Sequence, residues 1–245
     1  MFLIIKFGKI KKILIGIALF AVFMSVSPLL IKQQNRRETA VFSEEGYTVL
    51  IIDAGHGGTD GGAVSDNGTI ESKINLSIAQ KMNTLAHLIG IKTMMTRDKE
   101  ELDYPPEADT IRKKKVYDQK LRVTKINEIP DAVLISVHQN MFPSSQPRGP
   151  QVLYAPTETS DRLAETAQQN LLLVLPGNSR TAAQISDSIY LMNNIHCPAI
   201  LVECGFLSNS EDEYLLKNEA YQRKLSLLLI CSYMQFTNAS LTIAG

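Results

Sequence analysis

The sequence predicts an α/β domain with a mostly parallel central sheet flanked by helices, preceded by an N-terminal hydrophobic anchor helix. Short aliphatic runs alternate with longer amphipathic stretches along residues 47–240, as in sheets built from strand–helix–strand units. Three of the runs are apolar throughout, which is typical of buried parallel strands. At 245 residues the chain has room for one such domain and a short appendage.

The first segment, residues 1–31, has the composition of a membrane-targeting sequence. Several lysines precede an uncharged, mostly apolar run from Ile13 to Ile31, whose length is close to the ~20 residues that a helix needs to cross a bilayer. Lysines in this position favour export of the chain that follows. A cleaved signal peptide is the alternative: Ser25 and Ser27 suit a cleavage site, but Pro28 would follow the cut. We expect an uncleaved anchor, and either interpretation exports the domain.

Residues 32–46 are polar, and we interpret them as a linker before a domain at 47–240. The chain has 25 basic and 25 acidic side chains, and this balance argues against a nucleic-acid binder, which would carry a basic excess. The three cysteines, Cys197, Cys204 and Cys231, have no C-x-x-C spacing. We therefore expect neither a disulfide framework nor a cysteine-based metal site.

The first strand is expected from Tyr47 to Asp53, and a glycine-rich loop follows it. Residues 55–68 contain six glycines, too many for a regular element. A helix is expected from Thr69 to Ile89, ended by Gly90. Its apolar residues recur at spacings of three or four and form one stripe: Ile74, Ile78, Met82, Leu85 and Ile89.

A second strand is expected at Ile91–Thr96, an exposed acidic loop at Asp98–Asp109 and a second helix at Thr110–Asn127. This helix begins with the basic run Arg112–Lys115. We favour a solvated helix face opposite the acidic loop, and the alternative is a surface for anionic polymers.

A third buried strand is expected at Asp131–Val137, ending in His138-Gln139-Asn140. The remaining elements are expected in this order: a strand at Gln151–Tyr154, a helix at Ser160–Leu175, strands at Ser188–Met192 and Ala199–Val202, and one or two helices at Glu211–Phe236.

Three of the expected buried strands are followed by a residue that can bind a metal or move a proton: His56, His138 and Glu203. If the strands are parallel, their carboxyl ends meet at one edge of the sheet. A carboxylate directly after a buried strand is costly to bury unless a positive or hydrogen-bonding group receives it, and a structural salt bridge is the alternative. Glu71 lies in the first turn of the next helix, where the helix dipole favours negative charge.

Two imidazoles and one carboxylate are a usual ligand set for catalytic zinc, and a second carboxylate nearby can act as general base on water. Cys204 follows Glu203 and would point to the opposite face of an extended strand. The other two histidines, His87 and His196, are expected to be structural or to face solvent.

Four segments together resemble the zinc-dependent N-acetylmuramoyl-L-alanine amidases of the third amidase type, over residues 47–236. The segments are Asp53-Ala54-Gly55-His56-Gly57-Gly58, Glu71, Ser136-Val137-His138-Gln139-Asn140 and Glu203-Cys204-Gly205-Phe206-Leu207-Ser208-Asn209. The resemblance implies an enzyme that cuts the amide bond between the lactyl group of N-acetylmuramic acid and L-alanine in the stem peptide of peptidoglycan.

The resemblance also implies roles for individual residues. One zinc ion per chain would be held by His56, Glu71 and His138. Glu203 would be the catalytic carboxylate, taking a proton from water and passing it to the leaving amine. Asn140 is a candidate for hydrogen bonding to substrate or to a ligand, and Asp53 for orienting a ligand histidine through its other ring nitrogen.

The N-terminal anchor, the single domain and the segment Ile189–Asn194 before Pro198 resemble the germination-specific, cortex-processing members of spore-forming bacteria. This implies work on spore cortex, a place outside the cytoplasm (membrane-anchored or in the cell wall, including the space between the forespore membranes) and room for an unidentified protein partner. Gln139 and Cys204 depart from the family pattern, in which a small and an apolar residue are more usual. The alternatives are a zinc peptidase or deacylase with another substrate, and a catalytically silent wall-binding protein.

Overall fold

The structure is a computed structural model that describes residues 49–175 and 179–243. The expected anchor at 1–31, the linker at 32–46 and the domain start at Tyr47 lie outside the described residues. Within the described part, no helix combines the length and the apolar character needed to cross a bilayer.

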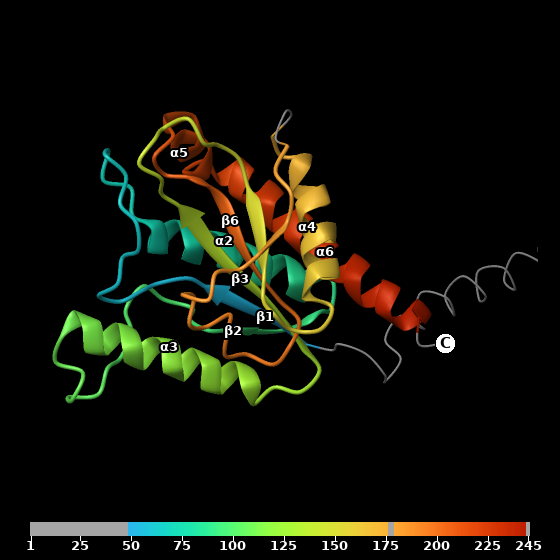
Figure 1. The fold of residues 1–245 in the computed structure, drawn as a ribbon, viewed down its shortest axis with the longest axis horizontal. Coiled ribbons are helices and arrows are strands. Elements are labelled where there is room, and N and C mark those ends of the chain that lie inside the picture. Colours follow the sequence, from blue (N-terminus) through green and yellow to red (C-terminus); the bar gives the residue numbers. More distant parts are fainter. Residues whose placement is uncertain (1–48, 176–178, 244–245) are drawn as a thin grey trace, which may run out of the picture. The chain divides into compact units, whose positions relative to one another are not determined.

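One sheet of six strands, in the order β2-β1-β3-β6-β4-β5, forms the centre of the domain (Figure 1). The strands are β1 Val49–Ala54, β2 Lys92–Met95, β3 Ala132–Asn140, β4 Gln151–Tyr154, β5 Ala183–Gln184 and β6 Ala199–Phe206. The helices are α2 Glu71–Leu88, α3 Ile111–Asn127, α4 Ser160–Leu172, α5 Ser210–Leu216 and α6 Glu219–Ile243.

The sheet is mixed: four of its five strand pairings are parallel, as expected of a mostly parallel sheet, and one is antiparallel. Strands β2, β1, β3 and β6 pair in parallel. Strand β4 runs antiparallel to β6, and β5 pairs in parallel with β4. A parallel return needs a crossover of a dozen or more residues, usually a helix. Only the loop 141–150 joins β3 to β4, so the chain returns in the opposite direction.

The strand expected at Ser188–Met192 is wrong, because this segment forms turns. Asn193 donates side-chain hydrogen bonds to the carbonyls of Ser186 and Ile189, and Asn194 donates one to Tyr190. These local bonds compete with a strand ladder. Leu191 and Met192 pack into the core, whereas Ile189 and Tyr190 face outward. The short strand β5, at 183–184, was not expected.

Two hydrophobic cores lie on the two faces of the sheet. Leu50 and Ile52 of β1 pack with apolar residues of α2, α4 and α6, whereas Val49 and Ile51 pack with Ile126 of α3 and with the 191–195 turn. Because side chains alternate along a strand, one face of the sheet is presented to α3 (Figure 1). The polar residues at the strand ends lie on this face.

The helix α2 is held by the predicted apolar stripe. Ile74, Ile78 and Met82 are buried, and Gly90 follows the helix with a φ of 79°, a left-handed conformation that glycine adopts without strain. Ile89, the last member of the expected stripe, lies beyond the helix end and is half exposed. The stripe therefore fixes the body of the helix, whose first residue is Glu71.

The helix α3 packs on the sheet through few side chains. Thr110 caps its amino end, accepting a hydrogen bond from the backbone of Lys113. Only Arg122 and Ile126 of this helix are buried. The amino-terminal half of α3 therefore borders a cleft rather than a packed core.

Candidate active site

Two candidate residues, His138 and Glu203, face each other across neighbouring strands. They are register partners on β3 and β6, and both line a cleft of about 610 Å³ between the sheet and α3. One pair closer to the sheet interior, Asp53 of β1 is the partner of Ser136 on β3. The parallel strands thus bring the expected residues to one edge, as predicted.

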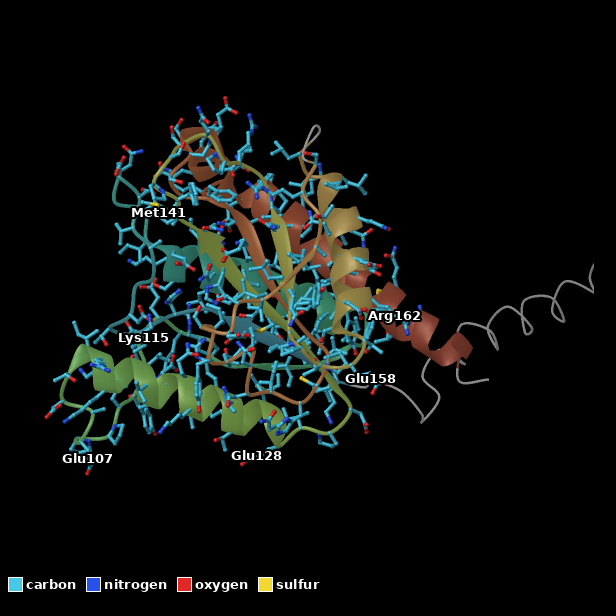
Figure 2. All side chains as sticks on the ribbon, viewed as in Figure 1. Glu107, Lys115, Glu128, Met141, Glu158 and Arg162 are labelled. Carbon is cyan, nitrogen blue, oxygen red and sulfur yellow. The ribbon has the colours of Figure 1, made fainter. Side chains whose placement is uncertain are left out.

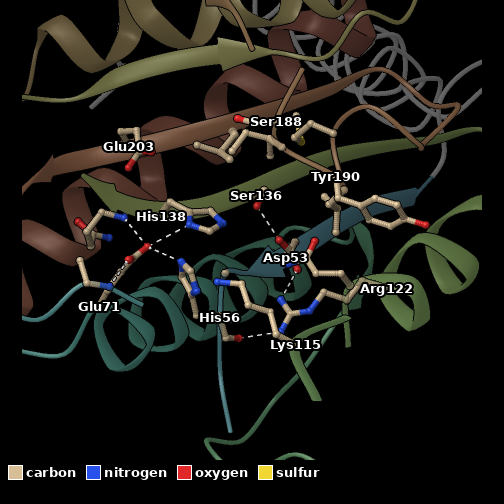
Figure 3. A pocket seen from close by; sticks show the side chains of 18 of the residues that line it. Asp53, His56, Glu71, Lys115, Arg122, Ser136, His138, Ser188, Tyr190 and Glu203 are labelled. Carbon is tan, nitrogen blue, oxygen red and sulfur yellow. Dashed lines mark hydrogen bonds and ion pairs between the residues drawn. The ribbon is translucent and has the colours of Figure 1, made fainter. Parts of the chain in front are cut away.

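His56 is displayed by a strained turn directly after β1. Its φ is 59°, a left-handed conformation that is uncommon for a residue with a side chain. Two contacts hold it: the backbone oxygen accepts a hydrogen bond from Arg122 at 2.7 Å, and the ring Nδ1 lies 2.9 Å from Oδ2 of Asp60. The second contact leaves Nε2 directed toward Glu71 (Figure 3).

Glu71 reaches the strand ends from α2, on the face of the sheet opposite to α3. Its side chain is 3% exposed. Oε2 accepts a hydrogen bond from the backbone of Ala63 at 2.8 Å, and Oε1 accepts one from the backbone of Gln139 at 3.1 Å. Asn75, one helical turn later, also donates to Oε1. The carboxylate is therefore fixed by the loop, the strand and its own helix.

His56, Glu71 and His138 form a compact group, and their ligand atoms all lie within 4.8 Å of one another. Oε1 of Glu71 is 3.0 Å from Nδ1 of His138 and 3.3 Å from Nε2 of His56 (Figure 3). Ligands of a tetrahedral metal at 2.0–2.1 Å lie roughly 3.3 Å apart, so these three atoms can hold a metal ion with little movement. The donor set suits a divalent metal of the zinc type.

The charges of the three residues complement one another. Burial lowers the pKa of His56, but hydrogen bonds to Asp60 and Glu71 outweigh it and raise the pKa to about 9. Burial alone would raise the pKa of Glu71, yet the two histidines hold it well below its usual range. A proton on His56 thus balances the negative charges of Asp60 and Glu71.

Glu203 differs from Glu71 in having an oxygen without a partner. Its Oε2 is buried and makes no hydrogen bond among the described residues. Burial raises the pKa of Glu203 to about 7, and the charge of Glu71 adds to this rise, whereas His138 and His56 oppose it. A carboxyl group with a pKa near neutrality can both accept and return a proton. It is suited to general acid–base chemistry.

The comparisons with known proteins agree with this geometry. The family model for N-acetylmuramoyl-L-alanine amidase (Amidase_3) matches residues 50–230. The chain belongs to this amidase family. It is 33% identical to the germination-specific N-acetylmuramoyl-L-alanine amidase of Bacillus subtilis, over 73% of this chain and 75% of that protein. It is 30% identical to LytC of the same organism, covering 79% of this chain but 35% of LytC.

Among solved structures, the amidase is similar to CwlD of Clostridioides difficile, solved in complex with the GerS lipoprotein. The TM-score is 0.74 and the identity 33%, over 77% of this chain and 98% of that one. Family, fold and site geometry therefore lead to the same class of enzyme.

Asp53 does not touch either histidine of the group. Its oxygens accept hydrogen bonds from Thr96, Ser136 and Arg122, and these partners, against the effect of burial, lower its pKa to about 2. The contact to a histidine that was expected of Asp53 comes instead from Asp60. Asp60 was missed in the sequence because it lies inside the glycine-rich loop, whose path no periodic pattern reveals.

Two buried arginines, also missed in the sequence, hold the loop that carries His56. Arg97 donates to the backbone oxygens of Ala54, Gly55 and Ser72. Arg122 donates to those of Ala54 and His56 while paired with Asp53. Arg97 comes just after β2, so its place at a strand end was the one signal in the sequence.

Glu213 of α5 holds the far half of the same loop. Its carboxylate accepts hydrogen bonds from the side chains of Ser65, Asn67 and Thr69. This contact joins residues about 145 positions apart in the chain, so no local pattern could have predicted it. It fixes the loop immediately before Glu71.

The remaining predicted residues fall into two groups. Asn140, at the end of β3, lines the cleft, and its backbone oxygen accepts a hydrogen bond from Leu207. The side chain of Gln139 is buried and donates to Asn75, and Cys204 is buried in the core under α2 and α6. Both departures from the family pattern pack on the α2 side of the sheet, and Gln139 also contributes to the lining of the cleft. His87 and His196 are not part of the site.

Proposed function

We propose that this amidase cleaves the bond between the lactyl group of N-acetylmuramic acid and L-alanine with one zinc ion held by His56, Glu71 and His138. The observation that carries the proposal is the convergence of these three ligand atoms within 4.8 Å, beside a carboxylate with an unpartnered oxygen. Zinc, when bound, supplies a Lewis acid that polarises the scissile carbonyl and makes water more acidic.

In this proposal the protein's own residues provide the proton transfers and the alignment. Oε2 of Glu203 takes a proton from the attacking water and returns it to the nitrogen of the leaving L-alanine, so the amide becomes a carboxylate and an amine. Asp60 keeps Nδ1 of His56 occupied and so presents Nε2 to the metal. Asn140 is the proposed hydrogen-bond partner for substrate.

We further propose that the substrate is spore cortex. The support is the similarity to the germination-specific amidase of B. subtilis, which extends over 75% of that protein. The enzyme would act outside the cytoplasm, and the N-terminal segment 1–31 would direct its export. The C. difficile relative was solved with a lipoprotein, and we propose a membrane-associated partner of that kind for this chain.

The test combines metal analysis with the products released from purified peptidoglycan. The wild type should contain one zinc per chain and release new L-alanine amino termini. His138→Ala should lose the metal and the activity, whereas Glu203→Ala should keep the metal and lose the activity. Undiminished wall hydrolysis by Glu203→Ala would refute the proposed role of this carboxylate. Amino ends formed only within the stem peptide would refute the amidase reaction and favour a zinc peptidase.

Cortex and vegetative wall can be compared in the same assay. Faster release from cortex peptidoglycan, alone or with co-purified lipoproteins, supports the cortex role, and equal release from both contradicts it.

A further inference from the structure

The helix α3 forms one wall of the cleft with a regular stripe of side chains. The lining residues are Arg112, Lys115, Val116, Gln119 and Lys120, together with the buried Arg122 that pairs with Asp53. The first five recur at positions i, i+3, i+4, i+7 and i+8, which places them on one side of a helix. Figure 2 shows Lys115 on the side of α3 that faces the strands.

The basic run that opens this helix is divided between two surroundings. Lys113 pairs with Asp109 at 2.9 Å, and the ammonium of Lys114 lies over the ring of Tyr104. Both lysines therefore contact the acidic loop 98–109, as we expected of a solvated helix face. Arg112 and Lys120 line the cleft instead, and neither makes an ion pair with any residue that the structure describes.

Apart from Glu203, the acidic groups that line the cleft already have partners of their own. Asp53 pairs with Arg122, and Glu71 contacts the two histidines. Lys115 is bound to Asp60 at 3.1 Å. The positive charges of Arg112 and Lys120 are thus left for something that enters the cleft, and a patch of positive charge on one wall attracts groups of negative charge.

The position of this wall relative to His56, Glu71 and His138 indicates which part of the substrate it would contact. Lys115 contacts Asp60, which contacts His56, so the middle of the wall lies beside the scissile bond of the proposed reaction, with Arg112 before it on the helix and Lys120 after it. An extended peptide advances ~3.3–3.6 Å per residue. The second or third residue of a stem peptide, which carries a free carboxylate, would therefore lie along α3.

We propose that Arg112 and Lys120 bind a carboxylate of the stem peptide downstream of L-alanine, and so select acidic stem peptides. This inference rests on the proposed amidase reaction. Lys115 is left out of the test because it also holds Asp60. Arg112 can form the bidentate contact that guanidinium groups make with carboxylates.

The test compares two muropeptides that differ only in whether the α-carboxyl of the second residue is free or amidated. The wild type should show a kcat/KM about tenfold higher for the free carboxylate, the effect of a partly screened ion pair. In the double variant Arg112→Gln/Lys120→Gln this ratio should fall to near one through a rise in KM. Lys113→Gln, on the same helix but outside the cleft, should keep the wild-type ratio.

Each outcome separates the inference from the reaction on which it rests. Equal rates for the wild type on both substrates, or a ratio that survives in the double variant, would overturn the inference alone. An equal loss on both substrates would point to general attraction to anionic wall polymers and would also overturn it. If the wild type cleaved neither substrate, the proposed reaction would fail and the inference with it. Zinc content and circular dichroism confirm that each variant is folded.

Discussion

Gly62→Ala should damage the metal group without removing any ligand. A Cβ built on Gly62 would lie 2.5 Å from Oε2 of Glu71 and 2.7 Å from Cδ2 of His56. Ordinary contacts of this kind begin at 3.4 Å, so one of the ligands must move by nearly an ångström. Metal sites tolerate deviations of roughly 0.2 Å in their ligand distances, and the required movement exceeds this.

Gly68→Ala provides a matched control within the same loop. Gly62 and Gly68 both have positive φ, 69° and 80°, so each alanine costs the fold a similar ~1–2 kcal/mol of backbone strain. A Cβ on Gly68 meets nothing within 4 Å. The difference between the two variants therefore isolates the collision with Glu71 and His56.

We expect zinc affinity to fall by about 10–100-fold in Gly62→Ala, the range found when the support of a metal ligand is lost, and to stay near wild type in Gly68→Ala. Affinity is measured by competition with a chromophoric chelator, and the stability of the metal-free protein by urea unfolding. Equal zinc affinities for the two variants would refute the reasoning, because they would show that Glu71 and His56 can yield without cost.

Three further predictions concern protons and the buried ion pair. Activity should rise with pH up to an inflection at or below pH 7, because Glu203 must lose its proton to act as a base. The pKa of Glu203 is about 7, and a bound metal would lower it. The same inflection in the residual activity of Glu203→Gln would contradict this. Zinc binding at pH 7 should release about one proton, because the pKa of His56 is about 9 in the metal-free site. The binding enthalpy measured by calorimetry should therefore change with the ionisation heat of the buffer, and an enthalpy that is the same in all buffers would contradict this. Asp53→Asn should destabilise the fold by about 1–3 kcal/mol, since it removes one of the two carboxylates that pair with the buried Arg122 and leaves only Asp118. The wild type should lose about 2 kcal/mol of stability as pH falls from about 4 through 2, because the pKa of Asp53 is 3.8 unfolded and about 2 folded. Asp103→Asn, fully exposed, is the control in the same unfolding assay.

Much of the fold could be read from periodicity. Buried strands appear as apolar runs and helices as stripes, so β1, β3, α2 and α3 were found to within a few residues. The direction of β4 depends on a connection without a helix, and the segment 188–192 depends on asparagine bonds to nearby carbonyls. Neither influence changes the hydrophobic pattern, so the pattern did not reveal the antiparallel pairing of β4, and the strand expected at 188–192 was wrong.

The sequence by itself determined which residues converge: His56, His138 and Glu203 each follow a buried strand, and parallel strands end at one edge. It also determined that Glu71 lies in the first turn of the helix after a loop rich in glycine. Only the tertiary structure decided how these groups are held. Asp60 takes Nδ1 of His56 because the loop folds back on itself, and backbone oxygens of that loop bind arginines supplied by distant elements. Such contacts join residues with no common period, so they exist only once the layers have packed.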